Sequence, residues 1–434
     1  MESPTENVEF KSYKRKWGIL ALFTIICMCN GTQWSQYSVV GKVFAFYYND
    51  ADLYAIYWTN WIYFISTFFL ILPATWLINL KGLQVAITLA MVLNCVGTWI
   101  RLLSIDPELF WVALLSQTLI SISRVFVVST PIVLAVTWFK PNQVASACAI
   151  GIAGFQLGNG LGILISDAVI HESVRKYEIE YEMSYLYWST AIAHSIVLLL
   201  VFILFRSAPL TPPSKVEAEK SNLMEKKGIF HSIKSLLSNT KFVTLLTISG
   251  INQAVFYYTV FGMRYMGDSA EGIEEKYAVT LSATMVLSGA LGAIVCGVIF
   301  DRTKKLQIFS FVIYAISALA MMVFCLLSSK IRRFNIIFLY INAGILGFSL
   351  VGYMPMAYRY ATELVYPELE ANSSAVFTMG STFLTFVLGS IFVLFYQIEY
   401  YHPNYICWWM SGALIIGCIF LASIFVSINR ARRV

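Results

Sequence analysis

Two clusters of aromatic and amide side chains stand in the middle of apolar stretches, where they could bind a small solute. The first consists of Gln33, Trp34, Ser35, Gln36 and Tyr37, and the second of Asn252, Gln253, Phe256 and Tyr257. In each cluster a glutamine and a tyrosine are one helical turn apart, so both would share a face. Aromatic faces attract a quaternary ammonium, with about 0.5–2 kcal/mol for each contact, and need no buried carboxylate. The clusters therefore predict an aromatic cage for a cation; the alternative is that these rings only pack.

Arg124 is the one strong charge that we place deep inside an apolar stretch. Such a charge usually faces a cavity or a partner. It could extend to the interface, contact an anionic substrate or hydrogen-bond helix carbonyls, and we favour a structural or gating role. No Asp or Glu lies deep within an apolar stretch, so an acidic proton relay has no evident carrier.

Three glycines follow one another at four-residue spacing, at Gly154, Gly158 and Gly162. On a helix they form a seam that lets a second helix approach the backbone closely. Gln156 lies off that seam, where it could contact a ligand or only accompany the packing.

The segment 297–305 reads GVIFDRTKK, which resembles the loop G-x-x-x-D-R-x-G-R/K-R/K of the major facilitator superfamily. In that superfamily the aspartate caps or pairs with a neighbouring helix end and holds one state closed, so the resemblance implies gating roles for Asp301 and Arg302. The alternative is an ordinary basic turn after a helix. The first-half counterpart is reduced to Asn79-Leu80-Lys81-Gly82, so gating would depend on the second copy.

The composition indicates that these residues stand in membrane helices. The chain has 434 residues, of which 58% are hydrophobic and 12% charged, whereas soluble domains carry about 25% charged residues. The net charge of +6 comes from short loops and not from one amphipathic face, which argues against nucleic acid binding. The eight cysteines lie in apolar stretches without metal-ligand spacing, so we expect no metal and no cofactor. The absence of a P-loop and of a complete catalytic constellation argues against an enzyme.

A helix needs about 20 apolar residues to cross the hydrocarbon of a bilayer. Twelve segments meet this requirement, so we predict an all-α membrane protein with twelve transmembrane helices. The predicted spans are 17–43, 55–78, 84–104, 108–138, 143–166, 184–206, 241–265, 277–300, 306–328, 334–361, 371–397 and 403–427.

A polar stretch over 207–240 separates six predicted spans from six others. This division is that of the major facilitator fold, in which two pseudo-symmetric halves enclose a site near the midplane. The predicted parts are an N-terminal tail (1–16), a six-helix half (17–206), the linker (207–240), a second six-helix half (241–427) and a C-terminal tail (428–434).

The basic residues predict the orientation, because short cytoplasmic loops retain Lys and Arg. Lys14-Arg15-Lys16, Lys140, the linker and the C-terminal tail fall on one side. Both termini are therefore expected in the cytoplasm, with the plasma membrane as the expected location. The loop 329–335, which contains three basic residues, favours the opposite orientation, but the basic segments on the other side outnumber it.

Several ordered stretches together resemble the feline leukaemia virus subgroup C receptor-related family, a major facilitator group associated with choline, ethanolamine and haem transport. The resemblance covers most of the chain. The stretches that carry it are 13–17 (YKRKW), 33–37 (QWSQY), 138–144 (WFKPNQV), 156–158 (QLG), 256–257 (FY), 301–302 (DR), 352–355 (GYMP) and 363–368 (ELVYPE).

The resemblance implies roles for particular residues. Trp34 and Tyr257 match the aromatic walls around a choline head group in that family, and Gln156 matches a glutamine that would take the hydroxyl end. Two positions depart from the pattern: Thr382 stands where the family has a glutamine, and Arg124 where we expect an uncharged glutamine. Because Arg124 in the cavity would repel a cation, a different substrate is possible.

We therefore expect a monomeric uniporter in the lipid bilayer that moves choline or a related amine by alternating access. Import is the expected direction, since a cation moves downhill by about 2.3 kcal/mol per 100 mV of inside-negative potential. One alternative is a carrier of haem or another organic anion, which would use Arg124 and the histidines. The others are a receptor or sensor that binds without transport and, least favoured, a membrane enzyme.

Overall fold

The computed structural model describes residues 13–49, 53–171, 175–209, 229–267, 275–303, 306–328, 336–365, 370–397 and 403–431. Over these residues the chain is helical and contains no strand. The predicted all-α class is thus confirmed, and most of the tail 1–16, the linker residues 210–228 and the loop 329–335 lie outside the described part. The helices are α1 (Arg15–Trp34), α2 (Gln36–Val39), α3 (Gly41–Tyr47), α4 (Leu53–Arg101), α5 (Phe110–Trp138), α6 (Val144–Val169), α7 (Lys176–Leu204), α9 (Ile229–Ser238), α10 (Thr240–Gly267), α11 (Glu275–Thr303), α12 (Leu306–Ser328), α13 (Ile336–Leu364), α14 (Glu370–Gln397) and α15 (Pro403–Ala431).

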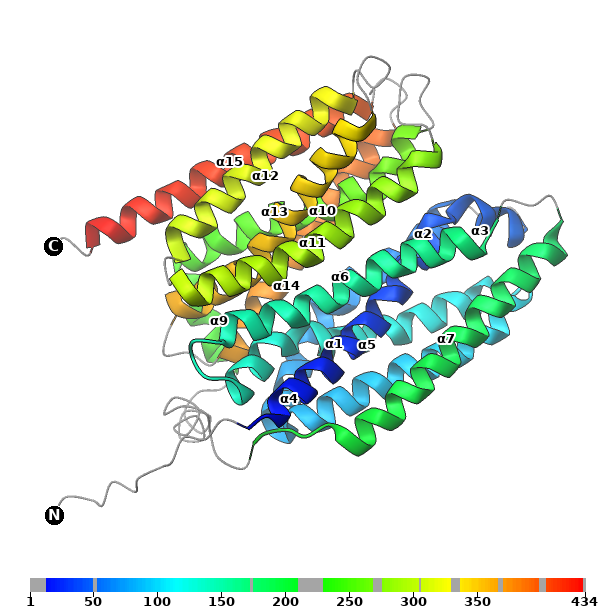
Figure 1. Cartoon of the computed structure of the whole chain (residues 1–434), viewed down its shortest axis with the longest axis horizontal. Coiled ribbons are helices and arrows are strands. Elements are labelled where there is room, and N and C mark those ends of the chain that lie inside the picture. The colour runs from blue at the N-terminus through cyan, green and yellow to red at the C-terminus, as the bar shows by residue number, and fades with distance from the viewer. Residues whose placement is uncertain are drawn as a thin grey trace.

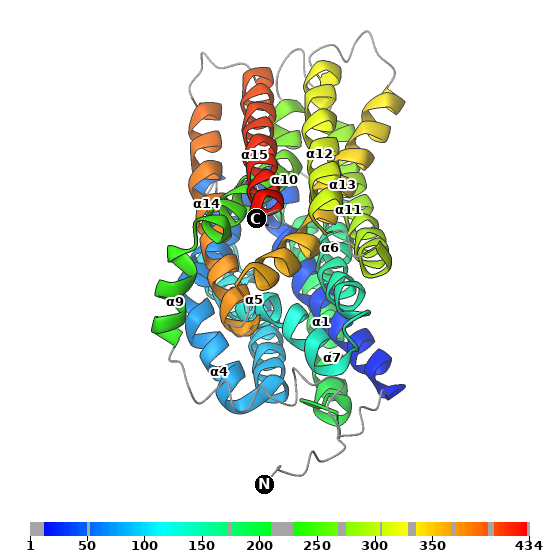
Figure 2. The same cartoon turned by 90° about the vertical axis from the view of Figure 1, so that its left-hand side faces the viewer.

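Ten helical segments among the described residues are long and apolar enough to cross a membrane. One of them contains all of α4 after its first two residues, and the 49 residues of α4 would extend about 73 Å if they were straight. Its backbone breaks at Gly82, where φ is 80°, a value that glycine adopts at little steric cost. The light-blue ribbon of α4 doubles back at one end of the bundle (Figure 2).

The first predicted span, 17–43, is shorter in the structure. Helix α1 ends at Trp34, and two short helices, α2 and α3, follow it. The backbone leaves the helical region at Val40, with φ −112° and ψ 33°. β-Branched Val39 and Val40 next to Gly41 are poor helix formers, which explains why the helix does not continue to residue 43.

The helices form two groups (Figure 1): α1 to α7 in one and α10 to α15 in the other. Within the first group α1 packs on α6 and α4 on α5, and within the second α11 packs on α13. Contacts between the groups run mainly from α6 to α11 and from α4 to α14. The two groups therefore pack directly against each other through these two pairs of helices.

The glycine seam in α6 accepts α1 directly, as its spacing predicts. A Cβ atom on Gly154 would lie 2.8 Å from the carbonyl oxygen of Thr24, and one on Gly162 would lie 2.5 Å from that of Thr32. A Cβ atom on Gly158 would overlap the carbonyl oxygen of Met28. The two backbones thus touch at three positions over about two helical turns, which fixes Trp34 at the end of α1 relative to Gln156 in α6.

Candidate functional site

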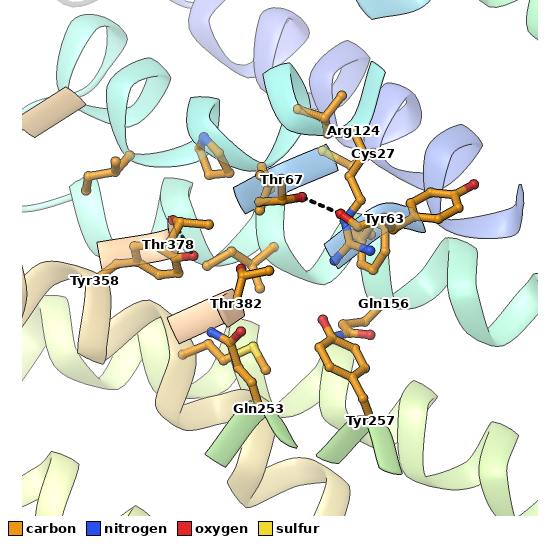
Figure 3. Close-up of a pocket in the computed structure, with 18 of the residues that line it drawn as sticks. Cys27, Tyr63, Thr67, Arg124, Gln156, Gln253, Tyr257, Tyr358, Thr378 and Thr382 are labelled. Atoms are coloured by element: carbon orange, nitrogen blue, oxygen red, sulfur yellow. Dashed lines mark hydrogen bonds between the residues drawn. The ribbon is translucent and has the colours of Figure 1, made fainter. Parts of the chain in front are cut away.

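A cavity of about 80 Å³ lies between the two groups of helices (Figure 3). Side chains from α1, α4, α5 and α6 form one wall, and side chains from α10, α13 and α14 form the other. It is lined by Cys27, Tyr63, Phe64, Thr67, Arg124, Val127, Val128, Pro131, Ile132, Gly151, Ile152, Phe155, Gln156, Gln253, Tyr257, Met354, Tyr358, Thr378 and Thr382.

Aromatic rings from both halves meet at one end of this cavity. The ring centres of Trp34 and Tyr257 are 4.6 Å apart, with their planes at 70°, which is an edge-to-face contact. Trp34 also contacts the rings of four other residues: Tyr63, Phe64, Phe155 and Phe261. It is fully buried and is not itself one of the described lining residues, because other side chains cover it.

Arg124 covers the indole from the cavity side. Its guanidinium carbon lies 4.1 Å from the ring centre of Trp34 and 4.4 Å from that of Phe155. Arg124 is only 8% exposed, and its Nη1 has no hydrogen-bond partner among the described residues. The Tyr257 hydroxyl interacts with the side chains of both Arg124 and Gln156. The aromatic cluster therefore holds a cation already, and that cation belongs to the protein.

The rest of the described lining is mostly aliphatic and carries a few neutral polar groups. Gln156, Gln253 and Thr382, for which we expect substrate contacts, line the cavity. So do Tyr358 and Thr378, whose hydroxyl oxygens are 3.0 Å apart. The described lining residues include no Asp or Glu. The cavity thus combines aromatic faces, amide and hydroxyl groups, and one positive charge.

Gln33 and Tyr37 do not reach this cavity, because a second buried arginine engages them. Arg101 is fully buried, and its Nη1 donates to the side-chain oxygens of Gln33 and Gln36. Its guanidinium carbon also lies 5.5 Å from the ring centre of Tyr37, and the Tyr37 hydroxyl is 3.0 Å from that of Tyr187. Arg101 is thus a second buried arginine, which lies at the end of α4 and of a predicted span.

Phe256 is also buried away from the described lining and packs beside Tyr257, with ring centres 5.1 Å apart. A substrate contact by Gln33, Tyr37 or Phe256 stays a prediction. Sequence reasoning missed the rings of Tyr63 and Phe155 and the hydroxyl of Tyr358. One signal was available for Tyr358, which lies one helical turn after Met354, a residue of the stretch 352–355 that carries the resemblance.

Asp301 joins the two halves at one end of the site. Its carboxylate accepts hydrogen bonds from the backbone N–H groups of Ala145 and Ser146, at 3.2 and 2.7 Å, and from the Ser146 hydroxyl. These groups open α6, so the aspartate of one half caps a helix of the other. Arg302 is exposed. In the first half, the counterpart of the Asp301 loop is the segment 79–82. Its Asn79 side-chain amide donates a hydrogen bond to the Asn372 side-chain oxygen at 3.1 Å.

The comparisons with known proteins agree with this architecture. The sequence profile of the Major Facilitator Superfamily matches residues 22–390. The crystal structure of the major facilitator transporter FucP in the outward conformation superposes with a TM-score of 0.70 at 11% identity, covering 95% of this chain and 99% of that one. At this identity the likeness shows the fold alone.

Two sequence relatives are much more similar. The choline/ethanolamine transporter flvcr2a of Danio rerio is 33% identical over 380 residues, 86% of this chain and 80% of that protein. The choline/ethanolamine transporter FLVCR2 of Homo sapiens is 30% identical over 392 residues, 90% of this chain and 73% of that protein. The chain therefore belongs to the major facilitator superfamily and, within it, to the family of these choline/ethanolamine transporters, so it is a membrane transporter and not an enzyme.

Proposed function

We propose that this transporter carries a small solute with a choline-type ammonium head group, and that Trp34, Tyr257 and Gln156 form its site. One observation carries the proposal: a guanidinium cation already rests on the faces of Trp34 and Phe155. Rings that hold one cation in this buried place can hold another. The relatives named as choline/ethanolamine transporters support the same head group.

The size of the cavity and the placement of the histidines favour this solute over haem. At about 10–15 Å³ for each water-sized guest, the cavity of about 80 Å³ accepts a solute of choline size and not a macrocycle. Of the histidine side chains that the structure describes, His194 has ring nitrogens 2.6 and 3.1 Å from backbone carbonyl oxygens. The other, His171, pairs with Glu182 at 3.0 Å. Neither is among the described residues that line the cavity.

Transport would proceed by alternating access, because contacts between the halves lie on both sides of the cavity. The Asp301 cap is on one side, and the contact of Trp34 with Phe261 is on the other. Breaking one set while keeping the other would open the cavity to one face of the membrane at a time. Without an acidic residue in the described lining, we favour facilitated uniport. For a solute with net positive charge, the inside-negative potential then favours import.

The proposed topology has twelve spans. Ten helical segments meet the membrane criterion; dividing α4 at Gly82 adds one, and α10, whose 28 residues are long enough for a bilayer, adds another. The distribution of basic residues favours cytoplasmic termini, and we propose a plasma-membrane monomer with both termini in the cytoplasm and with the halves and linker as predicted. Antibody access to a C-terminal tag tests this orientation: staining of intact cells would contradict it.

Uptake of radiolabelled choline, ethanolamine and glycine betaine by cells that express the full chain tests the proposed function. We expect saturable uptake of at least one of them, and Tyr257→Ala should lower it at least about tenfold because the ring facing Trp34 is lost. Tyr257→Phe keeps the ring and should retain most of the uptake, as should Tyr185→Ala, which removes a ring that is 65% exposed. Full activity of Tyr257→Ala, or no uptake of any of the three, would contradict the proposal.

Asp301→Ala should weaken closure at the Asp301 end of the cavity. A lost helix cap costs about 0.5–2 kcal/mol, which shifts the open population by roughly 2- to 30-fold. Cys148 in α6, which is only 1% exposed, is a native reporter. Its labelling by an impermeant thiol reagent, applied to inside-out vesicles and followed by mass spectrometry, should speed up by that factor. Thr303→Ala is the control, because the Thr303 hydroxyl donates within its own helix. Equal labelling rates of Cys148 in the two variants would contradict the gating role of Asp301.

A further inference from the structure

We infer that the preferred substrate is a zwitterion: a quaternary ammonium group joined by a short chain to a carboxylate or phosphate. The inference rests on the proposed function and specifies its substrate class. It follows from the charge that Arg124 brings to the cavity, from the place that its guanidinium occupies, and from the groups that surround it.

The described lining of the cavity has a net positive charge. Arg124 lines it, and the described lining residues contain no carboxylate that could balance the guanidinium. Arg124 is also only 8% exposed, and its Nη1 has no hydrogen-bond partner among the described residues. A buried cation with an unused donor favours an anionic guest group, which would supply both the missing charge and the missing acceptor.

The ammonium subsite is occupied by the same side chain. Arg124 stands 4.1 Å from the ring centre of Trp34, so an incoming ammonium group must displace the guanidinium before it can rest on the indole. A simple cation has no anionic group that could pair with the displaced guanidinium, and its own charge repels the guanidinium. A zwitterion offers both exchanges at once, because its anionic group pairs with Arg124 while its ammonium group takes the ring.

The remaining polar groups suit the anionic end. The side-chain amides of Gln156 and Gln253 and the hydroxyl of Thr382 extend into the cavity (Figure 3). All three can donate hydrogen bonds to a carboxylate or phosphate oxygen. The small volume of the cavity limits the chain between the two charges to a few atoms, so the geometry points to compounds such as glycine betaine or phosphocholine.

Uptake into liposomes that contain the purified full chain tests the inference. With wild type we expect kcat/KM for glycine betaine to exceed that for choline at least about tenfold, and betaine uptake to ignore a valinomycin-imposed potential. Arg124→Gln should reverse the preference and make choline uptake rise with inside-negative potential. Phosphocholine in a parallel series shows whether the anionic group is a phosphate; preference for either zwitterion over choline supports the inference.

The control is Arg175→Gln, which removes an exposed arginine that pairs with Glu178 and should leave the wild-type preference intact. If Arg124→Gln fails to fold, a competition experiment with the wild-type protein decides. Unlabelled zwitterion must then inhibit the uptake of labelled substrate more strongly than unlabelled choline does. Wild-type preference for choline, or an unchanged preference in Arg124→Gln, overturns the inference. Choline uptake that depends on Tyr257 leaves the proposed function standing in that case, whereas no uptake of any ammonium compound overturns both.

Discussion

Trp34→Ala is expected to lower saturable uptake of the ammonium substrate at least about thirtyfold, the largest functional effect that we predict for one residue. The indole contacts four residues that line the cavity: Tyr63, Phe64, Phe155 and Tyr257. It also presents the face on which a cation rests at 4.1 Å. A desolvated contact between a cation and a ring contributes about 2 kcal/mol or more, and each 1.4 kcal/mol is about tenfold in affinity.

Loss of folding must be separated from loss of the site, because truncating a buried tryptophan costs about 3–5 kcal/mol of stability. Trp34→Phe fills much of the space and keeps an aromatic face, so it should retain measurable uptake with a raised KM. Trp76→Ala removes an indole that is 56% exposed and should behave as wild type. Uptake is compared at equal surface expression, and wild-type uptake by a folded Trp34→Ala protein would remove the aromatic cage from the mechanism.

Part of this site follows from the sequence alone. Trp34 and Tyr257 stand at equivalent places in the two predicted halves, so a cage that joins the halves follows from the repeat architecture, and the rings do meet at 4.6 Å. Arg124 can also be identified from the sequence as a candidate site residue, because a charge so deep in an apolar stretch needs a cavity or a partner.

Which other side chains lie beside Trp34 and Tyr257 does not follow from the sequence. Gln33 and Tyr37 share a helix face with each other, but helical spacing does not say which neighbour that face meets. In the structure it meets Arg101, which comes from a predicted span end more than sixty positions later. The rings of Tyr63 and Phe155 were missed for the same reason: an aromatic residue in a membrane span is common, and only the packing of α1, α4 and α6 brings these two beside Trp34.

Gly158→Ala is expected to destabilise the protein strongly, although it adds a single methyl group. The added Cβ would overlap the Met28 carbonyl oxygen, which is backbone and cannot rotate away, so α1 and α6 must separate. Overpacking of this kind costs about 1–3 kcal/mol, and Trp34 and Gln156, which these two helices carry, would move apart. We expect a lower melting temperature in detergent and reduced uptake from the surviving protein.

Gly344→Ala is the matched control, because a Cβ atom on Gly344 of α13 would meet nothing within 4 Å. Alanine is the better helix former by about 1 kcal/mol, so this variant should melt at the wild-type temperature or above it. The opposite signs at two helical glycines separate a packing effect from any general effect of adding a methyl group. A Gly158→Ala protein as stable as Gly344→Ala would mean that α1 and α6 are farther apart than the glycine seam requires, and the position of Trp34 beside Gln156 would lose its physical basis.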